Sequence, residues 1–462
     1  MAMTSPIAIP RIVIAATGSG VGKTTATVAI LGALRASGLR IAAFKCGPDY
    51  LDPTYHARVI GKPSQNLDGW MMGRDAVLST FARGAQGADI AVIEGMMGLF
   101  DGAAPERDEG STAEIAKWLA APVLLVHDAS GIARTVSAVA LGFARFDPEL
   151  RLAGLICNRI GSRGHLDLLV RSRPEVPVLG GFPANASLSF PERHLGLISA
   201  SAEIVPDRLI QDWSRMAGEW LDLDTIVSIA RSAPPLEVPA SPATSTRATR
   251  CRIGIAYDDA FHFYYEDNLR RLEQLGAELI RFAPSRDQSL PDVDGLYFGG
   301  GYPEVEAREL SSNSKMLESI RTFAGEGHPI YAECGGLMYL GEGIRTLHGT
   351  LWPMAGLLPG VAVMADRLQA LGYVEVETRA PTIFGPPGLR FRGHQFRYSK
   401  LEPTHRELLA EKTYLVKPRW GDAFEEGFAR GNVLGSYIHA HWASSPDVAE
   451  GFIRACEASR KR

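Results

Sequence analysis

The chain has 462 residues, which at roughly 150 residues per domain predicts two large domains or three ordinary ones. Apolar residues make up 46% and charged residues 22%, a balance that excludes a disordered, collagen-like or coiled-coil protein. The formal net charge of −4 gives no basic footprint, so nucleic acid is not expected as a partner. No run of about 18 uncharged apolar residues occurs, so no membrane partner is expected either.

The cysteines argue against a disulfide framework and against a zinc site. There are five of them, and none forms a C-x-x-C pair. The N-terminus has no basic region followed by a cleavage site, so no signal peptide is predicted. These features favour a reducing, cytoplasmic setting. The cysteines are Cys46, Cys157, Cys251, Cys334 and Cys456.

Short apolar runs alternate with helical patterns through the first half of the chain. Each run is continuous and rich in Val, Ile, Leu and Ala, which predicts a strand buried on both faces. One helix is expected to open at Gly22 and another near Ser111, because Ser111 and Glu114 have the spacing of a capping box. The alternation predicts an α/β domain with a doubly wound parallel sheet. The predicted strands are Ile12–Ala15, Ile41–Phe44, Ile90–Ile93, Val123–Val126 and Leu152–Ile156.

A linker is predicted at residues 232–250. The stretch SAPPLEVPASPATSTRAT has four prolines, many small residues and no aromatic residue, a composition typical of segments that do not fold. An irregular loop inside one domain is the alternative. A fresh strand, Arg252–Ala256, and a following helical pattern favour two domains. We therefore expect a first domain at 1–231 and a second α/β domain at 251–462.

The sequence after the first predicted strand, ATGSGVGKTT, has the features of a phosphate-binding loop. Its glycines let backbone N–H groups turn toward phosphate oxygens, and the following helix adds its positive end. Lys23 is expected to bridge the β- and γ-phosphates, and Thr24 to bind Mg²⁺ through its hydroxyl. Thr17 stands where a glycine is usual, so the loop is a variant. The candidates for ATP binding are Gly18, Gly20, Gly22, Lys23, Thr24 and Thr25.

Two acidic segments follow strands of the same predicted sheet. Asp49 and Asp52 lie in KCGPDYLD after the second strand, and Glu94 ends the third strand in EGMMGLFDG, which also contains Asp101. Open α/β sheets bind ligands at the carboxyl ends of their strands, and a hard cation prefers oxygen ligands. These carboxylates are therefore candidates to complete a metal–phosphate site. A solvated carboxylate or a helix cap is the alternative for each.

In the second domain, PIYAECGGLMYL is a strand that enters a helix through a residue followed by two glycines. This pattern is typical of a nucleophile elbow, so Cys334 is a candidate nucleophile with a pKa lowered by the helix N-terminus. A small buried hydrophobic residue is the alternative. His439, at the end of a strand in LGSYIHAH, is the candidate base. Backbone N–H groups near Gly300, Gly301 and Gly335 are expected to stabilise an oxyanion.

These motifs resemble a known family over nearly the whole chain. GGGYPE, AECGGLMYL, GHQF and SYIHAHW, in this order, look like the glutamine amidotransferase domain of the cobyrinic acid synthase type, a class I glutaminase with a flavodoxin-like fold. ATGSGVGKTT, FKCGPDYLDP and EGMMGLFDG resemble the dethiobiotin-synthetase-like ATP domain of cobyrinic acid and hydrogenobyrinic acid a,c-diamide synthases. The variant phosphate loop also fits this family, whose loops carry an extra residue.

In the second domain, the resemblance implies that Cys334 is the glutaminase nucleophile and His439 the histidine that activates it. The usual third member of such sites, a glutamate two residues after the histidine, is His441 here. What orients His439 is therefore left open. His394 of the GHQF motif is expected to be structural.

In the first domain, the resemblance implies an ATP-dependent synthetase. Its metal positions match Thr24, Asp49 and Glu94, and its positions for ATP or substrate match Asp52 and Asp101. The expected cofactors are ATP and Mg²⁺. The expected partners are ATP, glutamine and a corrin polycarboxylate, and a homodimer is left open. Four cationic candidates could contact the macrocycle or could be ordinary surface charges, and the sequence leaves both alternatives open. They are Arg159, Arg163, Arg193 and His194.

The family reaction amidates the a and c acetates of hydrogenobyrinic or cobyrinic acid in cobalamin biosynthesis. It uses a glutaminyl thioester in one domain and an acyl phosphate in the other. The same motifs fit an enzyme that acts on nickel-sirohydrochlorin. A partitioning-type ATPase with a degenerate second domain is an alternative of another class, and it predicts no role for Cys334.

Overall fold

The computed structural model describes residues 4–184, 192–193, 196–197, 200, 204–239, 249–404 and 411–460. The chain folds as two units, Met1–Pro242 and Ala243–Arg462, and this boundary falls within the segment predicted to be a linker. Within the described ranges, every helix is too short or too polar to span a bilayer.

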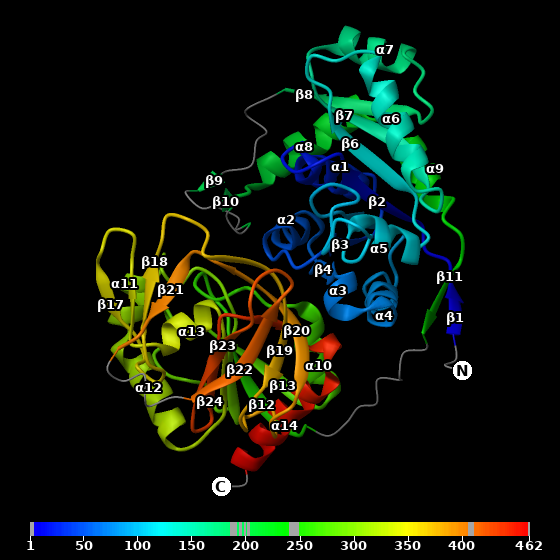
Figure 1. Ribbon diagram of the computed structural model, residues 1–462. Helices are drawn as coiled ribbons and strands as arrows, with labels where there is room; N and C mark the ends of the chain where they lie inside the picture. The colour runs from blue at the N-terminus through cyan, green and yellow to red at the C-terminus, as the bar shows by residue number, and fades with distance from the viewer. Residues whose placement is uncertain are drawn as a thin grey trace. The chain divides into compact units, whose positions relative to one another are not determined.

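The first unit is built on a seven-stranded sheet in the order β4-β3-β5-β2-β6-β7-β8, and every neighbouring pair is parallel (Figure 1). The predicted α/β class and the five predicted strands are confirmed. The sheet strands are β2 Arg11–Ala16, β3 Ile41–Cys46, β4 Gln65–Leu67, β5 Ile90–Glu94, β6 Val123–Asp128, β7 Leu152–Ile160 and β8 Val178–Pro183. A separate short pair is β9 Glu192–Arg193 and β10 Gly196–Leu197.

Helices follow the strands in alternation, as the sequence pattern predicts. Ser111 begins α5 as expected, since its hydroxyl accepts a hydrogen bond from the Glu114 amide at 3.1 Å. Strand β2 lies between β5 and β6, so the loop after it opens at the middle of the sheet's carboxyl edge. The helices are α1 Lys23–Ala36, α2 Leu51–Ile60, α3 Gly69–Met72, α4 Arg74–Gly84, α5 Thr112–Trp118, α6 Thr135–Phe146, α7 Arg163–Arg171, α8 Asp207–Trp220 and α9 Leu223–Arg231.

Part of the segment predicted to be a linker is ordered on the first unit. Strand β11, Leu236–Pro239, pairs antiparallel with β1, Thr4–Ile7. Leu236 and Val238 point to the same side of the strand and are buried. This alternation of two apolar residues among prolines is a weak strand signal, and the proline-rich composition outweighed it in the sequence analysis.

The second unit contains a ten-stranded mixed sheet in the order β13-β12-β14-β15-β24-β23-β22-β19-β20-β25. Its first five strands are parallel, as expected of a doubly wound domain. The remaining neighbours are antiparallel, an extension that the sequence analysis did not predict. A four-stranded sheet, β17-β16-β18-β21, accompanies it.

The strands of the second unit are β12 Cys251–Ala256, β13 Ala277–Phe282, β14 Gly295–Phe298, β15 Ile330–Glu333, β16 Gly343–Arg345, β17 Leu351–Pro353, β18 Val361–Met364, β19 Ala370–Thr378, β20 Arg390–Arg397, β21 Ser399–Glu402, β22 Glu411–Pro418, β23 Phe424–Arg430, β24 Val433–Ser436 and β25 His439–His441. Its helices are α10 Glu266–Gln274, α11 Ala307–Ser312, α12 Ser314–Gly325, α13 Gly335–Leu340, the 3₁₀ turn η3 Trp442–Ser444 and α14 Pro446–Arg460.

The antiparallel part of this sheet curls back on itself. Strands β24 and β25 are the first and last of the six consecutive strands β24-β23-β22-β19-β20-β25. Only Tyr437 and Ile438 separate them in the chain. Ser436 and His439 are three Cα–Cα steps apart and thus separated by at most about 11 Å, so the last strand must return close to the first. We call these six strands the six-strand circuit.

Candidate active site

The nucleophile elbow predicted in the second unit is present between β15 and α13. Cys334 has φ +47° and ψ −102°, a conformation that non-glycine residues rarely adopt. A Cβ at Gly335 would lie 2.9 Å from Pro303 Cδ, and one at Gly336 would lie 2.6 Å from the Phe298 carbonyl oxygen. The two glycines are therefore required for the close packing that supports the sharp turn.

The glycine-rich loop after β14 approaches both the elbow and His439. A Cβ on Gly300 would lie 2.5 Å from His439 Cε1. Gly301 has φ +154°, and its amide nitrogen lies 3.1 Å from the position that a Cβ on Gly335 would take. The loop thus places its backbone amides next to the elbow, where donors to an oxyanion are needed.

Burial controls the protonation of the nucleophile and the histidine. It raises the pKa of the Cys334 thiol to about 12 and lowers the pKa of His439 to about 3. The thiol pKa is therefore raised, whereas the sequence analysis expected it to be lowered by the helix N-terminus. Burial is the largest cause of the rise, and it outweighs the hydrogen bond with the Gly335 backbone, which lowers the pKa. The resting pair is neutral, and proton transfer must accompany the attack.

His394, which the sequence analysis expected to be structural, stacks on the candidate base. Its ring lies parallel to that of His439, with centroids 4.9 Å apart and 17° between the planes. Tyr265 Oη lies 2.9 Å from His394 Nδ1. A Cβ on Gly393 would lie 2.3 Å from the His439 carbonyl oxygen, so β20 needs a glycine there to pair with β25. The GHQF motif thus supports the imidazole of His439 from one side.

The phosphate-binding loop of the first unit has the expected backbone. Gly20 and Gly22 have φ +75° and +92°, and Asn158 Nδ2 donates to the Val21 carbonyl at 2.8 Å. Lys23 Nζ donates to the Met97 carbonyl at 3.1 Å. Gly18 lies in the same loop, and Thr25 lies in the first turn of α1. These contacts hold the loop in a turn with Lys23 at the start of α1.

A buried charged cluster lies directly beside this loop. Thr24 Oγ1 donates to Glu94 Oε1 at 2.8 Å and lies 3.4 Å from Asp52 Oδ2. Lys45 Nζ forms ion pairs with Asp52 and, at 3.2 Å, with Glu94. Burial works against the charge of Lys45, yet these two carboxylates raise its pKa above the usual value. Burial also opposes ionisation of Glu94, but Lys45 and His56 hold the pKa of Glu94 well below its usual range.

The sequence analysis missed Lys45 and His56. Both had a signal: Lys45 ends a buried strand beside the glycine of FKCGPDYLDP, and His56 follows Asp52 by four residues on α2. Residues four apart lie on one face of a helix, so Asp52 and His56 approach the cluster together.

The structure separates the acidic candidates. Asp52, rather than Asp49, lies beside Thr24. Asp49 Oδ1 accepts a hydrogen bond from the Leu51 amide at 2.7 Å at the start of α2, and its Oδ2 lies 3.9 Å from Lys45 Nζ. Asp101 Oδ2 accepts from the Gly98 amide at 2.9 Å and closes a turn. Asp101 thus lies in a loop turn, whereas Asp49 both holds the start of α2 and contacts Lys45 at the edge of the cluster.

The donor set of the cluster fits Mg²⁺. Thr24, Asp52 and Glu94 offer one hydroxyl and two carboxylates, the hard oxygen ligands that this cation prefers. In the described part of the chain, no group of three or more His, Cys, Asp or Glu side chains is arranged to hold a metal ion alone. Mg²⁺ at nucleotide sites usually takes one or two carboxylates and completes its shell with phosphates and water.

The cations considered for the macrocycle have structural contacts where they can be described. Arg159 Nη2 donates to the Gly20 carbonyl at 2.9 Å and pairs with Asp128. Arg163 lies over the Trp220 ring, 3.6 Å from its centroid. Arg193 lies on β9, and His194 lies outside the described residues. Arg159 therefore supports the phosphate loop, and Arg163 packs against α8.

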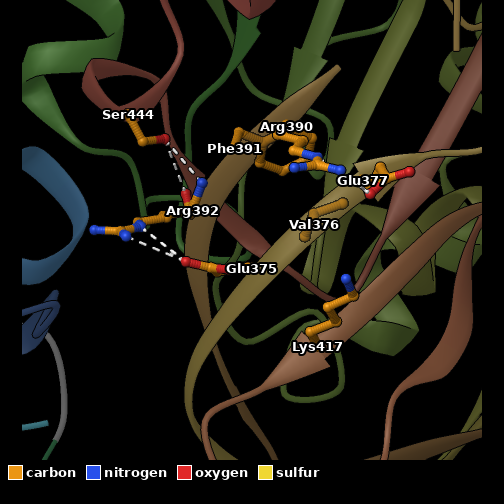
Figure 2. A pocket seen from close by; sticks show the side chains of 8 residues that line it. All are labelled: Glu375, Val376, Glu377, Arg390, Phe391, Arg392, Lys417 and Ser444. Atoms are coloured by element: carbon orange, nitrogen blue, oxygen red, sulfur yellow. Dashed lines mark hydrogen bonds and ion pairs between the residues drawn. The ribbon is translucent and has the colours of Figure 1, made fainter. Parts of the chain in front are cut away.

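A surface pocket of about 270 Å³ lies on the antiparallel extension of the second unit (Figure 2). Its charges are paired across the sheet: Arg392 Nη2 lies 3.2 Å from Glu375 Oε1, and Arg390 Nη2 lies 3.0 Å from Glu377 Oε2. Ser444 Oγ accepts from the Arg392 amide. None of the predicted site residues lines this pocket, so it is separate from the candidate site. The other lining residues are Val376, Phe391 and Lys417.

Two family models match the chain. Residues 12–197 match the CobQ/CobB/MinD/ParA nucleotide binding domain, and residues 252–447 match the CobB/CobQ-like glutamine amidotransferase domain. The two matches cover the two units that carry the phosphate loop and the nucleophile elbow.

Curated relatives are similar over nearly their whole length. A cobyrinate a,c-diamide synthase of Leptospira interrogans is 55% identical over 451 residues, which is 97% of this chain and 99% of the relative. Those of Syntrophotalea carbinolica and Dehalococcoides mccartyi are 45% and 43% identical, covering 97% and 96% of this chain and 98% of each relative. With both domains matched and these identities over the full length, the chain belongs to the cobyrinate a,c-diamide synthase family.

Proposed function

We propose that the chain amidates the a and c acetate carboxylates of hydrogenobyrinic acid or cobyrinic acid in cobalamin biosynthesis, using ATP and glutamine. The observation that carries this proposal is the presence of two half-sites in one chain. Cys334 sits on a strained elbow in one unit, and Thr24 lies beside Glu94 at a phosphate loop in the other. The name of the relatives, cobyrinate a,c-diamide synthase, supports a corrin substrate.

In the glutaminase half, Cys334 attacks the carboxamide carbon of glutamine while its thiol proton passes to His439. The amides around Gly301 and Gly335 stabilise the oxyanion that forms on the carbonyl oxygen. His439 then gives the proton to the leaving nitrogen, ammonia departs, and a glutamyl thioester remains on Cys334. Water hydrolyses the thioester to glutamate and restores the thiol.

In the synthetase half, the substrate carboxylate attacks the γ-phosphate of ATP and forms an acyl phosphate with release of ADP. Lys23 neutralises charge on the transferred phosphoryl group, and the amides of the glycine loop hold the phosphates. Ammonia then attacks the acyl carbon, and phosphate leaves. A free carboxylate is a poor electrophile, which is why each amidation consumes one ATP, and one glutamine supplies the ammonia.

Thr24, Asp52 and Glu94 are the residues that would hold Mg²⁺. When bound, the cation supplies charge neutralisation on the phosphate oxygens. Lys45 keeps Asp52 and Glu94 together inside the protein, where two carboxylates alone would repel each other.

The test is to incubate the purified protein with ATP, Mg²⁺ and glutamine, to offer cobyrinic acid and hydrogenobyrinic acid separately, and to identify the products by mass spectrometry. We expect double amidation of one preferred acid. Consumption of glutamine or ATP without amidation of either acid would overturn the corrin substrate and favour nickel-sirohydrochlorin. ATP hydrolysis with no glutaminase activity under any condition would favour the partitioning-type ATPase.

A further inference from the structure

Glu333, the residue directly before the nucleophile, carries a buried carboxylate held by three donors. Tyr331 Oη donates to Oε1 at 2.8 Å, the Ala440 amide donates to Oε1 at 3.0 Å, and Tyr297 Oη donates to Oε2 at 3.0 Å. The residue is only 1% exposed. A backbone amide can only donate, so this environment suits an ionised carboxylate in one fixed orientation.

The same carboxylate faces the catalytic imidazole. Glu333 Oε2 lies 4.0 Å from His439 Nδ1, and both residues are buried. The Ala440 amide that donates to Glu333 belongs to the residue after His439, so this hydrogen bond ties the histidine's own strand to the carboxylate. Catalytic hydrogen bonds are often long without substrate and shorten in the complex, so 4.0 Å fits a contact that closes during the reaction.

Related glutaminases carry a glutamate two residues after the catalytic histidine. This chain has His441 at that position, and His441 supplies no negative charge. His441 Nδ1 accepts from the Ala443 amide at 3.4 Å and begins η3. Burial lowers the pKa of His441 to about 4, so the ring is neutral near neutral pH. A neutral ring cannot compensate the positive charge that develops on His439.

We propose that Glu333 is the residue that positions His439 and stabilises its imidazolium form, in place of an acid two residues after the histidine. The inference rests on the proposed glutamine hydrolysis. Glu333 acts through Nδ1, which leaves Nε2 to take the proton of the Cys334 thiol and to return it to the departing ammonia. The carboxylate touches neither glutamine nor the thioester, so Glu333 is a positioning residue.

The titratable groups around this pair are buried histidines and tyrosines, together with the Cys334 thiol, whose raised pKa has Glu333 among its causes. The ring of His394 covers one face of His439, and burial together with the neighbouring histidines lowers the pKa of His394 well below its usual value. Burial is the largest cause that raises the pKa of the surrounding tyrosines, which therefore stay neutral. These tyrosines are Tyr264, Tyr297, Tyr331 and Tyr414. Glu333 is the next raising cause at three of them, whereas at Tyr414 Glu426 comes before Glu333. Burial raises the pKa of Glu333 to about 7, and its three donors oppose that rise.

Two substitutions separate charge from shape. Glu333→Gln keeps the shape and removes the charge, whereas Glu333→Asp keeps the charge on a shorter side chain. In the full-length protein we expect Glu333→Gln to lower kcat for glutamine hydrolysis by roughly 100-fold, with KM within about threefold of the unsubstituted protein. Glu333→Asp should retain more activity than Glu333→Gln. A side chain that served only as a spacer would give the opposite order.

The pH profile is the second measurement. The unsubstituted protein should lose kcat as pH falls through about 7, where Glu333 becomes protonated, and Glu333→Gln should lack this limb. The matched control is Glu426→Gln, another buried glutamate of the second unit, which accepts from Ser436 Oγ and the Tyr437 amide. It should keep the acid limb. Ammonia-dependent amidation, which the first unit performs, should be unchanged in all variants. A thermal denaturation curve like that of the unsubstituted protein verifies that the second unit is folded in each variant.

Several outcomes would overturn the inference. They are equal kcat in Glu333→Gln and the unsubstituted protein, higher activity in Glu333→Gln than in Glu333→Asp, and an identical acid limb in Glu333→Gln. If the unsubstituted protein itself hydrolyses no glutamine in the presence of ATP and either acid, the proposed function fails instead. The two failures are therefore distinct.

Discussion

His56 Nε2 lies 2.6 Å from Glu94 Oε2, and neither side chain has exposed surface. The other ring nitrogen, Nδ1, lies 3.0 Å from Ser64 Oγ, which donates to the Ala43 carbonyl at 3.1 Å. The ring is thus fixed at both nitrogens. It occupies Oε2 of Glu94 and leaves Oε1 for Thr24 and Lys45.

We expect His56→Ala to raise the Mg²⁺ concentration for half-maximal amidation by roughly 10-fold or more, because outer partners of a metal-binding carboxylate orient it. Ammonia-dependent amidation, titrated with Mg²⁺, measures this without the glutaminase. Ser64→Ala removes only the contact at Nδ1 and should give a smaller change in the same direction. An unchanged Mg²⁺ dependence in folded His56→Ala would contradict this role for the histidine.

Removal of the nucleophile should separate the two half-reactions. We expect Cys334→Ala to lower glutamine-dependent amidation by at least about 1,000-fold, whereas ammonia-dependent amidation stays within about twofold, since only the ammonia source is lost. Product formation with each nitrogen donor is the measurement. Cys251→Ala, at a buried cysteine on β12, should keep both activities. A folded Cys334→Ala protein that has lost both would show that the half-reactions are not separable.

A single methyl group at Gly300 should displace His439, the proposed base of the glutaminase half. A Cβ there would lie 2.5 Å from His439 Cε1, so the imidazole must move. Misplacement by about 1 Å can cost roughly 100-fold in rate, and we expect a loss of that order in kcat for glutamine hydrolysis by Gly300→Ala. Gly325→Ala, where no atom lies within 4 Å of the new Cβ, is the control. Equal glutaminase activity in the two variants would contradict this packing.

The partly buried carboxyl of Glu114 should make the free energy of unfolding of the first unit depend on pH. Burial, the largest effect, raises its pKa to about 7 although the Gly110 amide donates to it. A carboxyl with a raised folded-state pKa stabilises the fold at low pH and loses that contribution as pH rises through about 7. Glu114→Gln mimics the protonated form. It should match the unsubstituted protein at about pH 5 and be more stable by about 1 kcal/mol at about pH 8, a value discounted for partial exposure.

Chemical denaturation of the first unit at the two pH values measures this difference. The control is Glu106→Gln, at an exposed glutamate in the same loop region, which should change stability equally at both pH values. A stability difference for Glu114→Gln that is the same at about pH 5 and about pH 8 would refute the assignment.

Features set by local sequence were predictable. The parallel strands of the first unit, the variant phosphate loop and the elbow at Cys334 each follow from residues adjacent in the chain. Glycines at 20, 22, 335 and 336 were informative because only glycine fits those turns and close contacts. The N-cap at Ser111 is local in the same sense, although the Glu114 carboxylate accepts from the Gly110 amide rather than from the Ser111 amide of a full capping box.

Contacts between residues far apart in the sequence were not predictable, even where one partner, such as Lys45, lies in a recognisable motif. Lys45 meets Glu94 across two strands, and Glu333 meets His439 across more than one hundred residues of sequence. Spacing cannot reveal such contacts, because they depend on which strands become neighbours. The pKa of Cys334 was expected in the wrong direction for the same reason: burial at the elbow comes from segments that the motif does not include.

The six-strand circuit limits how the glutaminase could be transplanted or redesigned. His439 begins the last strand of the circuit, only three residues after the first strand ends at Ser436. A change of register in the β22–β23 hairpin would be transmitted around the circuit to β25, since each strand fixes the next. Grafting the cysteine and histidine motifs alone onto another sheet would therefore leave the histidine unplaced. The smallest portable module is the elbow together with the loop at Gly300 and Gly301 and all six strands.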